Sequence, residues 1–257
     1  MFKNIFKIKP SSKYPIGLGT SDLPNSIYQG KQPITSKEFK SFVNKYFKPK
    51  INSKGFKGRD FYFYRTNKEY TEAIFFWTYR AGGAIQVDLM VKFNDIKYPN
   101  NDKVIKPNNI RPENAEFLRR LSPFEVQNND IQVWFWIFKK RKKENKRIIN
   151  DIWCLFETCG LDYFNHFKNH KKYIENIGIN NFSEFPDFYI QKFFGRYIIG
   201  IVYFLFKYWL KFNDRQKAKV FAMKGIEIAK VRGDLNYKIE FEKYMNNQNP
   251  IANKKYT

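Results

Sequence analysis

The chain has 257 residues, of which 43% are hydrophobic and 19% are aromatic. This length fits one large domain or a domain with an extension, and the apolar content is sufficient for a packed core, which excludes a disordered chain. Lysine and arginine number 47 against 24 acidic residues, so the net charge is +23. This excess favours an anionic partner, which could be nucleic acid, an acidic protein or an anionic membrane. The alternative explanation of the positive charge is an AT-rich genome, which also enriches lysine, asparagine and aromatic residues.

The cysteine content and the hydropathy predict a cytoplasmic protein. Cys154 and Cys159 are five residues apart in a segment with helical periodicity, so they point ~140° apart and do not favour a disulfide. Two thiols in a chain of this length indicate a reducing compartment. The most hydrophobic stretch, residues 197–206, has half the ~20 residues of a membrane helix, so we expect a buried helix, no transmembrane segment and no membrane partner.

The chain opens with an irregular segment and then a helix. Residues 1–34 contain four prolines and three glycines, which predicts an irregular arm. Thr35 and Glu38 have the spacing of a capping box, and apolar residues from Phe39 onwards repeat at helical spacing. Pro49 is expected to kink or end that helix.

Antiparallel strands are predicted next. Residues 60–66 form one strand, and residues 70–79 and 84–93 flank Gly82-Gly83, a hairpin signal. With a loop of two or four residues, the numbers of paired positions add up to 165, and a three-residue loop would break this register. The predicted core face carries Ile74, Phe76, Val87, Leu89 and Val91. The other face carries Phe75, Trp77, Tyr79, Gln86, Asp88 and Met90.

The remaining elements complete an α+β pattern. A short helix is expected over residues 112–121, and a strand over 131–138 with Trp134 and Trp136 on one face. Helices then follow over 148–159, ending at Gly160, and over 162–176, 187–212, 214–231 and 235–245. Clustered strands followed by segregated helices predict an N-terminal helix on an antiparallel sheet of about four strands. The predicted organisation is an arm (1–34), an α+β domain (35–176) and a helical extension (177–257) packed on the same core.

A family resemblance covers roughly residues 36–176. The apolar helix running to Lys54-Gly55-Phe56, the strand Phe61–Arg65 and the hairpin after it resemble the domain-of-unknown-function family 4304. The resemblance implies an α+β fold and a bacterial origin. It implies no activity and no functional residues, because the family is uncharacterised.

The residues give little support for catalysis. Asp162, His166 and His170 share a helix face and could ligate zinc, but three lysines in the same segment oppose a divalent cation. Solvated or capping histidines are the reading that we favour. No nucleophile motif surrounds the histidines or Cys159. We therefore expect no metal and no cofactor, and an enzyme is less favoured than a binding protein.

The densest charge lies between the last predicted strand and the next helix. It comprises Lys139, Lys140, Arg141, Lys142 and Lys143, followed by Lys146 and Arg147. This basic run could lie along phosphates or on an acidic protein face, whereas the simpler alternative is a solvated loop. Cations at a helix N-terminus oppose the helix dipole, which favours a compensating anion.

The non-core sheet face is the second candidate surface. Phe75, Trp77 and Tyr79, joined by Trp134 and Trp136, would form an aromatic platform. Aromatic rings beside basic chain are typical of proteins that hold single-stranded nucleic acid. The alternative is that the C-terminal helices cover and bury this face.

We interpret the chain as a non-catalytic binding protein with a basic face for an acidic protein partner, as in small α+β immunity proteins. This comparison is an analogy at the level of the fold. The alternatives are nucleic-acid binding through residues 139–147 and the aromatic face, or an enzyme whose site the sequence does not reveal.

Overall fold

The computed structural model describes residues 34–78, 83–99, 105–121, 136–179 and 198–248. The chain divides into two compact units. The first unit comprises Met1–Tyr64, Ile74–Leu89 and Arg120–Tyr163. The second unit comprises Arg65–Ala73, Met90–Arg119 and Phe164–Thr257. The predicted arm 1–34 lies almost wholly outside the described residues.

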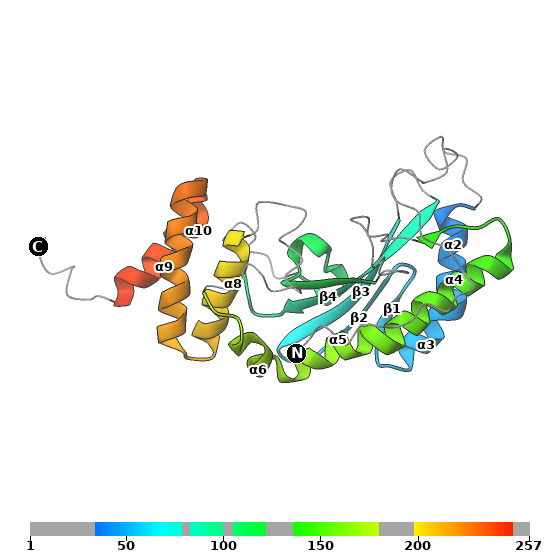
Figure 1. Cartoon of the computed structure of the whole chain (residues 1–257), viewed down its shortest axis with the longest axis horizontal. Helices are drawn as coiled ribbons and strands as arrows, with labels where there is room; N and C mark the ends of the chain where they lie inside the picture. The colour runs from blue at the N-terminus through cyan, green and yellow to red at the C-terminus, as the bar shows by residue number, and fades with distance from the viewer. Residues whose placement is uncertain (1–33, 79–82, 100–104, 122–135, 180–197, 249–257) are drawn as a thin grey trace, which may run out of the picture. The chain divides into compact units, whose positions relative to one another are not determined.

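The sheet has six described strands, and the fold is α+β as predicted (Figure 1). The strands are β1 (Lys57–Arg59), β2 (Tyr62–Thr66), β3 (Tyr70–Thr78), β4 (Ala84–Phe93), β5 (Phe117–Leu121) and β6 (Trp136–Ile137). Their order is β1-β2-β3-β4-β5, and β6 also pairs with β4. Two more strands are present than predicted, namely β1 and β5. They were not predicted because they are short and lie in segments that are rich in glycine, proline and charge.

Strand β5 replaces a predicted helix. Residues 112–121 were expected to be helical, but only a 3-10 turn forms at Pro112–Asn114, and Phe117–Leu121 is extended. The backbone N–H of Glu116 donates to the carbonyl of Val91 at 3.1 Å. Pairing with β4 therefore overrides the local helical preference, because it satisfies backbone groups that would otherwise be lost at a buried sheet edge.

The predicted assignment of side chains to sheet faces is confirmed for the core face. Its apolar members on β3 and β4 are all buried, namely Ile74, Phe76, Val87, Leu89 and Val91. The backbone N–H of Asn94 donates to the carbonyl of Glu69 at 2.9 Å, which joins positions whose numbers add up to 163 rather than 165. This two-residue shift leaves the assignment of faces unchanged, because side chains alternate with a period of two. The hairpin loop, residues 79–82, lies outside the described residues.

The first helix begins as predicted, is irregular just before Pro49, and ends at Asn52. The Thr35 backbone N–H donates to Glu38 Oε2 at 2.7 Å, and the Glu38 N–H donates to Thr35 Oγ1 at 3.1 Å, which completes the capping box. Helix α2 (Ser36–Phe42) runs through a π-helical turn (Val43–Phe47) into α3 (Lys48–Asn52). The Lys48 N–H bonds to the Val43 carbonyl, five residues back, so the hydrogen-bond ladder shifts just before Pro49, which has no donor.

Gly160 does not end the next helix, contrary to the prediction. Helix α4 (Lys142–Leu155) continues through a second π-helical turn (Phe156–Gly160) into α5 (Leu161–His166). A Cβ at Gly160 would lie 2.7 Å from the Phe156 ring and 3.2 Å from Leu89 Cδ1. The glycine is therefore explained by close packing of this turn on strand β4, and not by a left-handed helix end.

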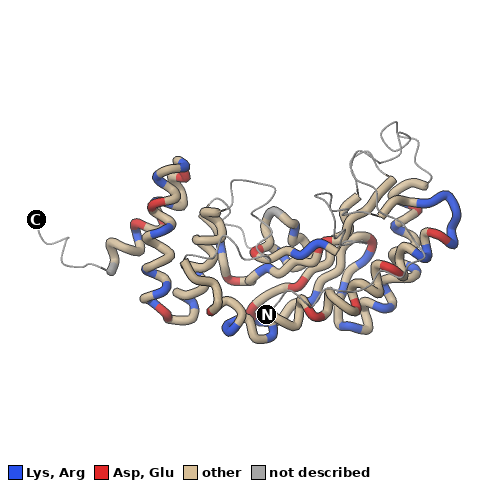
Figure 2. The backbone as a smooth tube through the Cα atoms, in the orientation of Figure 1, with Lys and Arg blue, Asp and Glu red and all other residues tan. Residues whose placement is uncertain are grey.

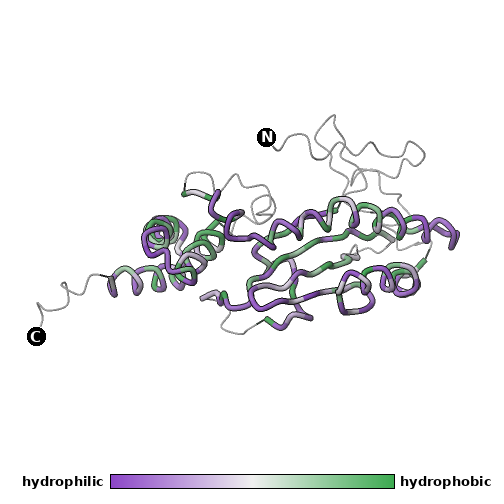
Figure 3. The backbone as a smooth tube through the Cα atoms, turned by 90° about the horizontal axis from the view of Figure 1, so that it is seen from below, coloured by the Kyte–Doolittle hydropathy of each residue, from purple (hydrophilic) through white to green (hydrophobic). Residues whose placement is uncertain are grey.

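The core of the first unit is aromatic and lies between these helices and the core face of the sheet. The Phe47 ring is 5.0 to 6.2 Å from the rings of Phe63, Phe76, Trp153 and Phe156, which come from two strands and from the α4 segment. Helix α4 alternates hydrophilic and hydrophobic stretches along its length, as an amphipathic helix does (Figure 3). One face of the first unit's sheet is therefore closed by helices.

The second unit contains the C-terminal helices. The long ones are α8 (Ile198–Lys211), α9 (Arg215–Arg232) and α10 (Leu235–Gln248), preceded by the 3-10 turn Phe167–Asn169 and α6 (His170–Glu175). Helix α9 ends before Gly233, which has φ of 74° as predicted for a helix C-terminus. Residues 187–197, the start of the helix predicted over 187–212, lie outside the described residues. Among the described helices, none has the length and apolarity required to cross a membrane.

Candidate binding surfaces

The basic run leads into helix α4 and is exposed. Lys140, Arg141, Lys142 and Lys143 are all exposed, and Lys139 is half-buried. Figure 2 shows this segment as a continuous blue stretch at the entrance to α4. Lys146 and Arg147, one turn further along the helix, are also exposed. The structure thus places the whole predicted run on one loop and the first two turns of one helix.

A buried asparagine fixes the backbone of this loop. The side chain of Asn145 is fully buried, and its Oδ1 accepts a hydrogen bond from the Lys139 N–H at 2.9 Å. Its Nδ2 donates to the carbonyls of Lys139 at 2.5 Å and Arg141 at 3.3 Å. These bonds hold the main chain in place while the cationic side chains remain exposed.

Two carboxylates, Glu144 and Glu38, lie near the positive charge at this end of α4. The helix begins at its positive dipole end, the N-cap residue Arg141 makes no side-chain capping bond, and Glu144 is the acidic residue of the first turn. The hydrogen bonds from Thr35 lower the pKa of Glu38, and the nearby charge of Lys142 adds to this effect. The cations of the run outnumber these two carboxylates.

A strip of four aromatic rings lies on the other face of the first unit's sheet. Successive ring centroids along Tyr64, Tyr62, Phe75 and Trp77 are 5.9, 6.2 and 5.6 Å apart. Three of these side chains are half-buried, and Trp77 is 42% exposed. We call these four residues the aromatic strip. Phe75 and Trp77 lie where the sequence predicted them.

Two cations border the aromatic strip on the neighbouring strand. Arg59 lies opposite Tyr62 and Lys57 lies opposite Tyr64 in the antiparallel β1–β2 register, so these side chains project on the same face. Both cations are exposed. Lys57, Arg59, Tyr62 and Tyr64 were not predicted as part of this surface, although the alternation in Tyr62-Phe63-Tyr64 indicates that the two tyrosines share one face.

Trp136 does not belong to this surface, which corrects the prediction. It lies opposite Ile85 in the β6–β4 register, so it shares the core face with Ile85 and Val87. It is 0% exposed, and its indole N–H donates to Asp151 Oδ2 of α4 at 2.8 Å. Tyr79 and Trp134 lie outside the described residues.

The predicted combination of basic run and aromatic face is also corrected, because the sheet separates the two. Helix α4, which carries the run, lies on the core-face side, because its Asp151 accepts the hydrogen bond from Trp136. The aromatic strip lies on the opposite face. A single ligand would therefore meet Lys57 and Arg59 beside the rings, and not residues 139–147.

A buried ion pair lies beside the strip on strand β4. Arg120 Nε donates to Asp88 Oδ1 at 2.7 Å, and Gln86 Nε2 lies 3.5 Å from Asp88 Oδ2. Burial raises the pKa of Asp88, and the Arg120 charge offsets part of this rise. Both groups satisfy each other within the protein, so the pair stabilises the local packing and offers no free acid to a substrate.

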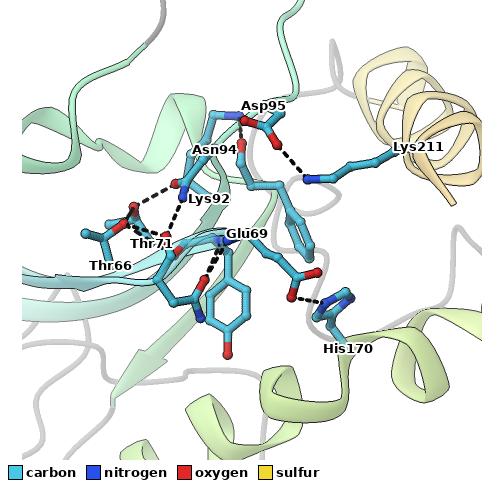
Figure 4. Close-up of polar contacts among 11 residues, drawn as sticks. Thr66, Glu69, Thr71, Lys92, Asn94, Asp95, His170 and Lys211 are labelled. Atoms are coloured by element: carbon cyan, nitrogen blue, oxygen red, sulfur yellow. Dashed lines mark hydrogen bonds and ion pairs between the residues drawn. The ribbon is translucent and has the colours of Figure 1, made fainter.

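In the second unit, a polar network ties the β2–β3 turn to the end of β4 (Figure 4). Thr66 Oγ1 and Thr71 Oγ1 are 2.8 Å apart, and Thr71 Oγ1 donates to Asn94 Oδ1 at 2.8 Å. Asn94 Nδ2 in turn donates to the carbonyl of Asn67 at 2.9 Å. The network consists of neutral groups bound to one another, which indicates a structural role.

The Lys92 ammonium group is buried nearby and fully occupied. It donates to the carbonyls of Phe93 at 3.1 Å and Ile96 at 3.0 Å, and to the Glu116 carboxylate. Burial raises the pKa of Glu116, whereas the Lys92 charge lowers it. Because all three N–H donors of Lys92 have acceptors, this lysine is not available as a base or a nucleophile.

His170 is buried and not solvated, contrary to the prediction. It is 6% exposed, its Nδ1 lies 2.8 Å from Tyr208 Oη on α8, and its Nε2 lies 2.9 Å from Glu69 Oε2. Burial raises the pKa of Tyr208, so this hydroxyl stays protonated and serves as a hydrogen-bond partner. Among the residues that the structure describes, no group of three or more side chains could hold a metal ion.

A hollow of about 410 Å³ lies in the second unit between α6 and the α8–α9 junction. Its wall combines two cations, Lys171 and Arg215, with two carboxylates, Glu175 and Asp214. Asp214 already accepts the Lys217 N–H at 3.0 Å as the N-cap of α9. The mixed charges favour no particular class of ligand.

The fold is that of an α+β protein with an antiparallel sheet. In the first unit, helices cover one face of this sheet. The family model for the domain of unknown function DUF4304 matches residues 47–166. This match agrees with the resemblance, over a shorter range than residues 36–176. No curated protein and no solved structure matches the chain significantly.

Proposed function

We propose that this is a non-catalytic binding protein that docks on an acidic protein through the basic run at the start of α4. The observation that carries the proposal is the exposure of four consecutive cations, residues 140–143, on a loop whose backbone is fixed by buried Asn145. A fixed loop loses little conformational entropy on binding, so more of the electrostatic attraction contributes to affinity.

The buried ionisable groups support binding over catalysis. Asp88 is paired with Arg120, Glu116 with Lys92, and His170 with Glu69 and Tyr208. A catalytic acid or base must reach a substrate proton, whereas these groups bond to one another. The exposed chemistry of the first unit's helical side is cationic, which suits charge complementarity with an acidic surface.

A matched pair of variants tests the proposal with a fluorescent 20-residue polyglutamate peptide as the acidic probe. Lys140→Ala/Lys142→Ala/Lys143→Ala removes three charges from the basic run. Lys219→Ala/Lys230→Ala/Lys243→Ala removes three exposed charges from α9 and α10. Exposed ion pairs contribute ~0.2–1 kcal/mol each, so we expect the first variant to bind several-fold to ~100-fold more weakly at physiological salt. Equal weakening in both variants would assign the interaction to net charge and reject the proposal.

Affinity capture with the same variants provides a second readout on natural partners. After nuclease treatment of a bacterial lysate, an acidic protein should be retained by the native chain and by the α9–α10 control. It should be lost with the variant of the basic run. A partner that is retained equally by all three chains would place the docking site elsewhere.

A further inference from the structure

We propose that Lys45, Tyr46 and Lys146 form a carboxylate-binding site between the first helix and α4, where a glutamate or aspartate side chain of the acidic partner is bound. We call these three residues the lysine–tyrosine cluster. The proposal rests on the docking proposed for the basic run, and it extends that surface from one helix to two.

The helical segment 36–52 and helix α4 lie side by side and run in the same direction (Figure 1). Four interactions between the two segments follow the same order along both, namely Glu38 with Lys142, Tyr46 with Lys146, Lys50 with Asn150 and Lys54 with Glu157. Both segments therefore begin at the same end of the first unit, which is also the end that carries the basic run.

The cluster places two cations at one ring. The Lys45 Nζ atom is 5.5 Å from the centroid of the Tyr46 ring, and the Lys146 Nζ atom is 5.1 Å from the same centroid. Both lysines are exposed, whereas Tyr46 is half-buried and stacks on Phe42 with the ring centroids 6.2 Å apart. Cation–π attraction orients the two ammonium groups without neutralising their charge. The partly buried ring thus positions two exposed cations that come from different helices.

The two cations of the cluster are not neutralised within the described part of the chain. Other lysines of the first helix have carboxylate partners, since Lys40 Nζ lies 3.6 Å from Asp60 Oδ2 and Lys54 Nζ lies 3.5 Å from Glu157 Oε1. Across the described ranges, Lys45 and Lys146 form no such ion pair. Like charges held at one ring repel each other, and a carboxylate bound beside them would offset this repulsion.

The position of the cluster on α4 connects it to the basic run. Lys142 and Lys146 are four residues apart on this helix, so they share a face and lie ~6 Å apart along its axis. A partner whose acidic side chains contact the run would therefore present further carboxylates to the cluster. Charge complementarity over two helices restricts how such a partner can be oriented.

A charge-matched pair of variants tests the site, with the fluorescent 20-residue polyglutamate peptide as the probe at physiological salt. Lys45→Ala/Lys146→Ala removes two charges from the cluster, and Lys219→Ala/Lys230→Ala removes two exposed charges from α9. Loss of two exposed ion pairs should weaken binding roughly 2-fold to 30-fold in the first variant, whereas the control should bind like the native chain. Equal affinities of the two variants would overturn the proposal. Circular dichroism establishes that each variant is folded.

A second pair of variants tests the positioning role of the ring without any change in charge. Tyr46→Leu removes the ring that orients both lysines, so we expect binding roughly two- to fivefold weaker than in the native chain. Tyr46→Phe keeps the ring and should retain the native affinity. If Tyr46→Leu binds like the native chain, the lysines act as independent surface charges, and the cluster is overturned as a site.

The same measurements separate this proposal from the docking proposed for the basic run. If the basic-run variant binds weakly while Lys45→Ala/Lys146→Ala binds like its control, the cluster is overturned and docking through the run stands. If only Lys45→Ala/Lys146→Ala binds weakly, the cluster is supported and the role of the run is rejected. A 12-nucleotide oligothymidylate that binds more tightly than polyglutamate, with the same dependence on Lys45 and Lys146, would overturn the assignment to a protein carboxylate.

Discussion

In strand β3, Ile74 and Phe76 point to one side of the sheet and are buried, while Phe75 and Trp77 point to the other, where Phe75 is half-buried and Trp77 is 42% exposed. The two sets are equally hydrophobic in character, and they alternate along a single strand. What differs is the cover: the π-helical turn between α2 and α3 packs on the first face through Phe47, which also contacts Trp153 of α4. Residue type therefore does not decide which face is core. The placement of helices decides which face carries the aromatic core of the first unit.

The largest difference between the faces should appear on truncation of Phe47. Phe47→Ala removes a fully buried ring that contacts four others, so we expect the free energy of unfolding to fall by ~3–5 kcal/mol. Urea denaturation monitored by circular dichroism measures this change. Trp77→Ala, the comparison on the other face, should cost less than about 1 kcal/mol, because most surface changes are small. Similar costs for both variants would show that Trp77 is part of the fold's packing.

A smaller effect should follow from crowding the helix–sheet contact on the closed face. Gly160→Ala places a Cβ 2.7 Å from the Phe156 ring and 3.2 Å from Leu89 Cδ1. Overpacking of this kind costs ~1–3 kcal/mol, which urea denaturation resolves. Thr158→Ala, at an exposed position of the same π turn, is the control and should change stability by less than about 1 kcal/mol. A neutral Gly160→Ala would mean that α4 and α5 are not pressed on the sheet as closely as described.

The smallest expected effect on stability concerns Glu38 at the N-terminus of α2, one of the helices that cover the core face. Hydrogen bonds from Thr35 lower the pKa of Glu38 below its ordinary value of 4.5. A carboxylate with a lowered pKa stabilises the fold above pH 4.5, and this contribution is lost as the pH falls through the lowered value. The difference in Tm between the native chain and Glu38→Gln should thus be largest at neutral pH and vanish in acid. Glu240→Gln on α10 controls for the change in net charge, and a difference that does not vary with pH would contradict the role of this carboxylate.

The sequence predicts well where local rules operate. The Thr35–Glu38 capping box, the buried face of the β3–β4 hairpin and the end of α9 before Gly233 all follow from spacing within a few residues. The exposure of the basic run is also predictable, because five adjacent cations are not expected to be buried in a core. These features required no knowledge of distant parts of the chain.

The errors arise where distant segments meet. Trp136 follows an alternating pattern, but which side of the sheet it faces depends on its pairing with Ile85, and a shift by one residue would reverse it. Glycine is typical of helix ends, but Gly160 is explained by its contact with Leu89, which lies more than 70 positions earlier in the chain. His170 resembles a solvated histidine until Tyr208 of α8 is placed against it.

From the sequence alone follow an α+β class, a strongly basic surface, the caps of individual helices and the alternation that separates one sheet face from the other. Only the tertiary structure decides which face is covered, that Trp136 is buried, and that Lys57 and Arg59 lie beside Tyr62 and Tyr64. The physical reason is the range of the interactions. Capping and alternation act over two to four residues, whereas burial and cross-strand neighbours depend on register and helix packing between segments far apart in the chain.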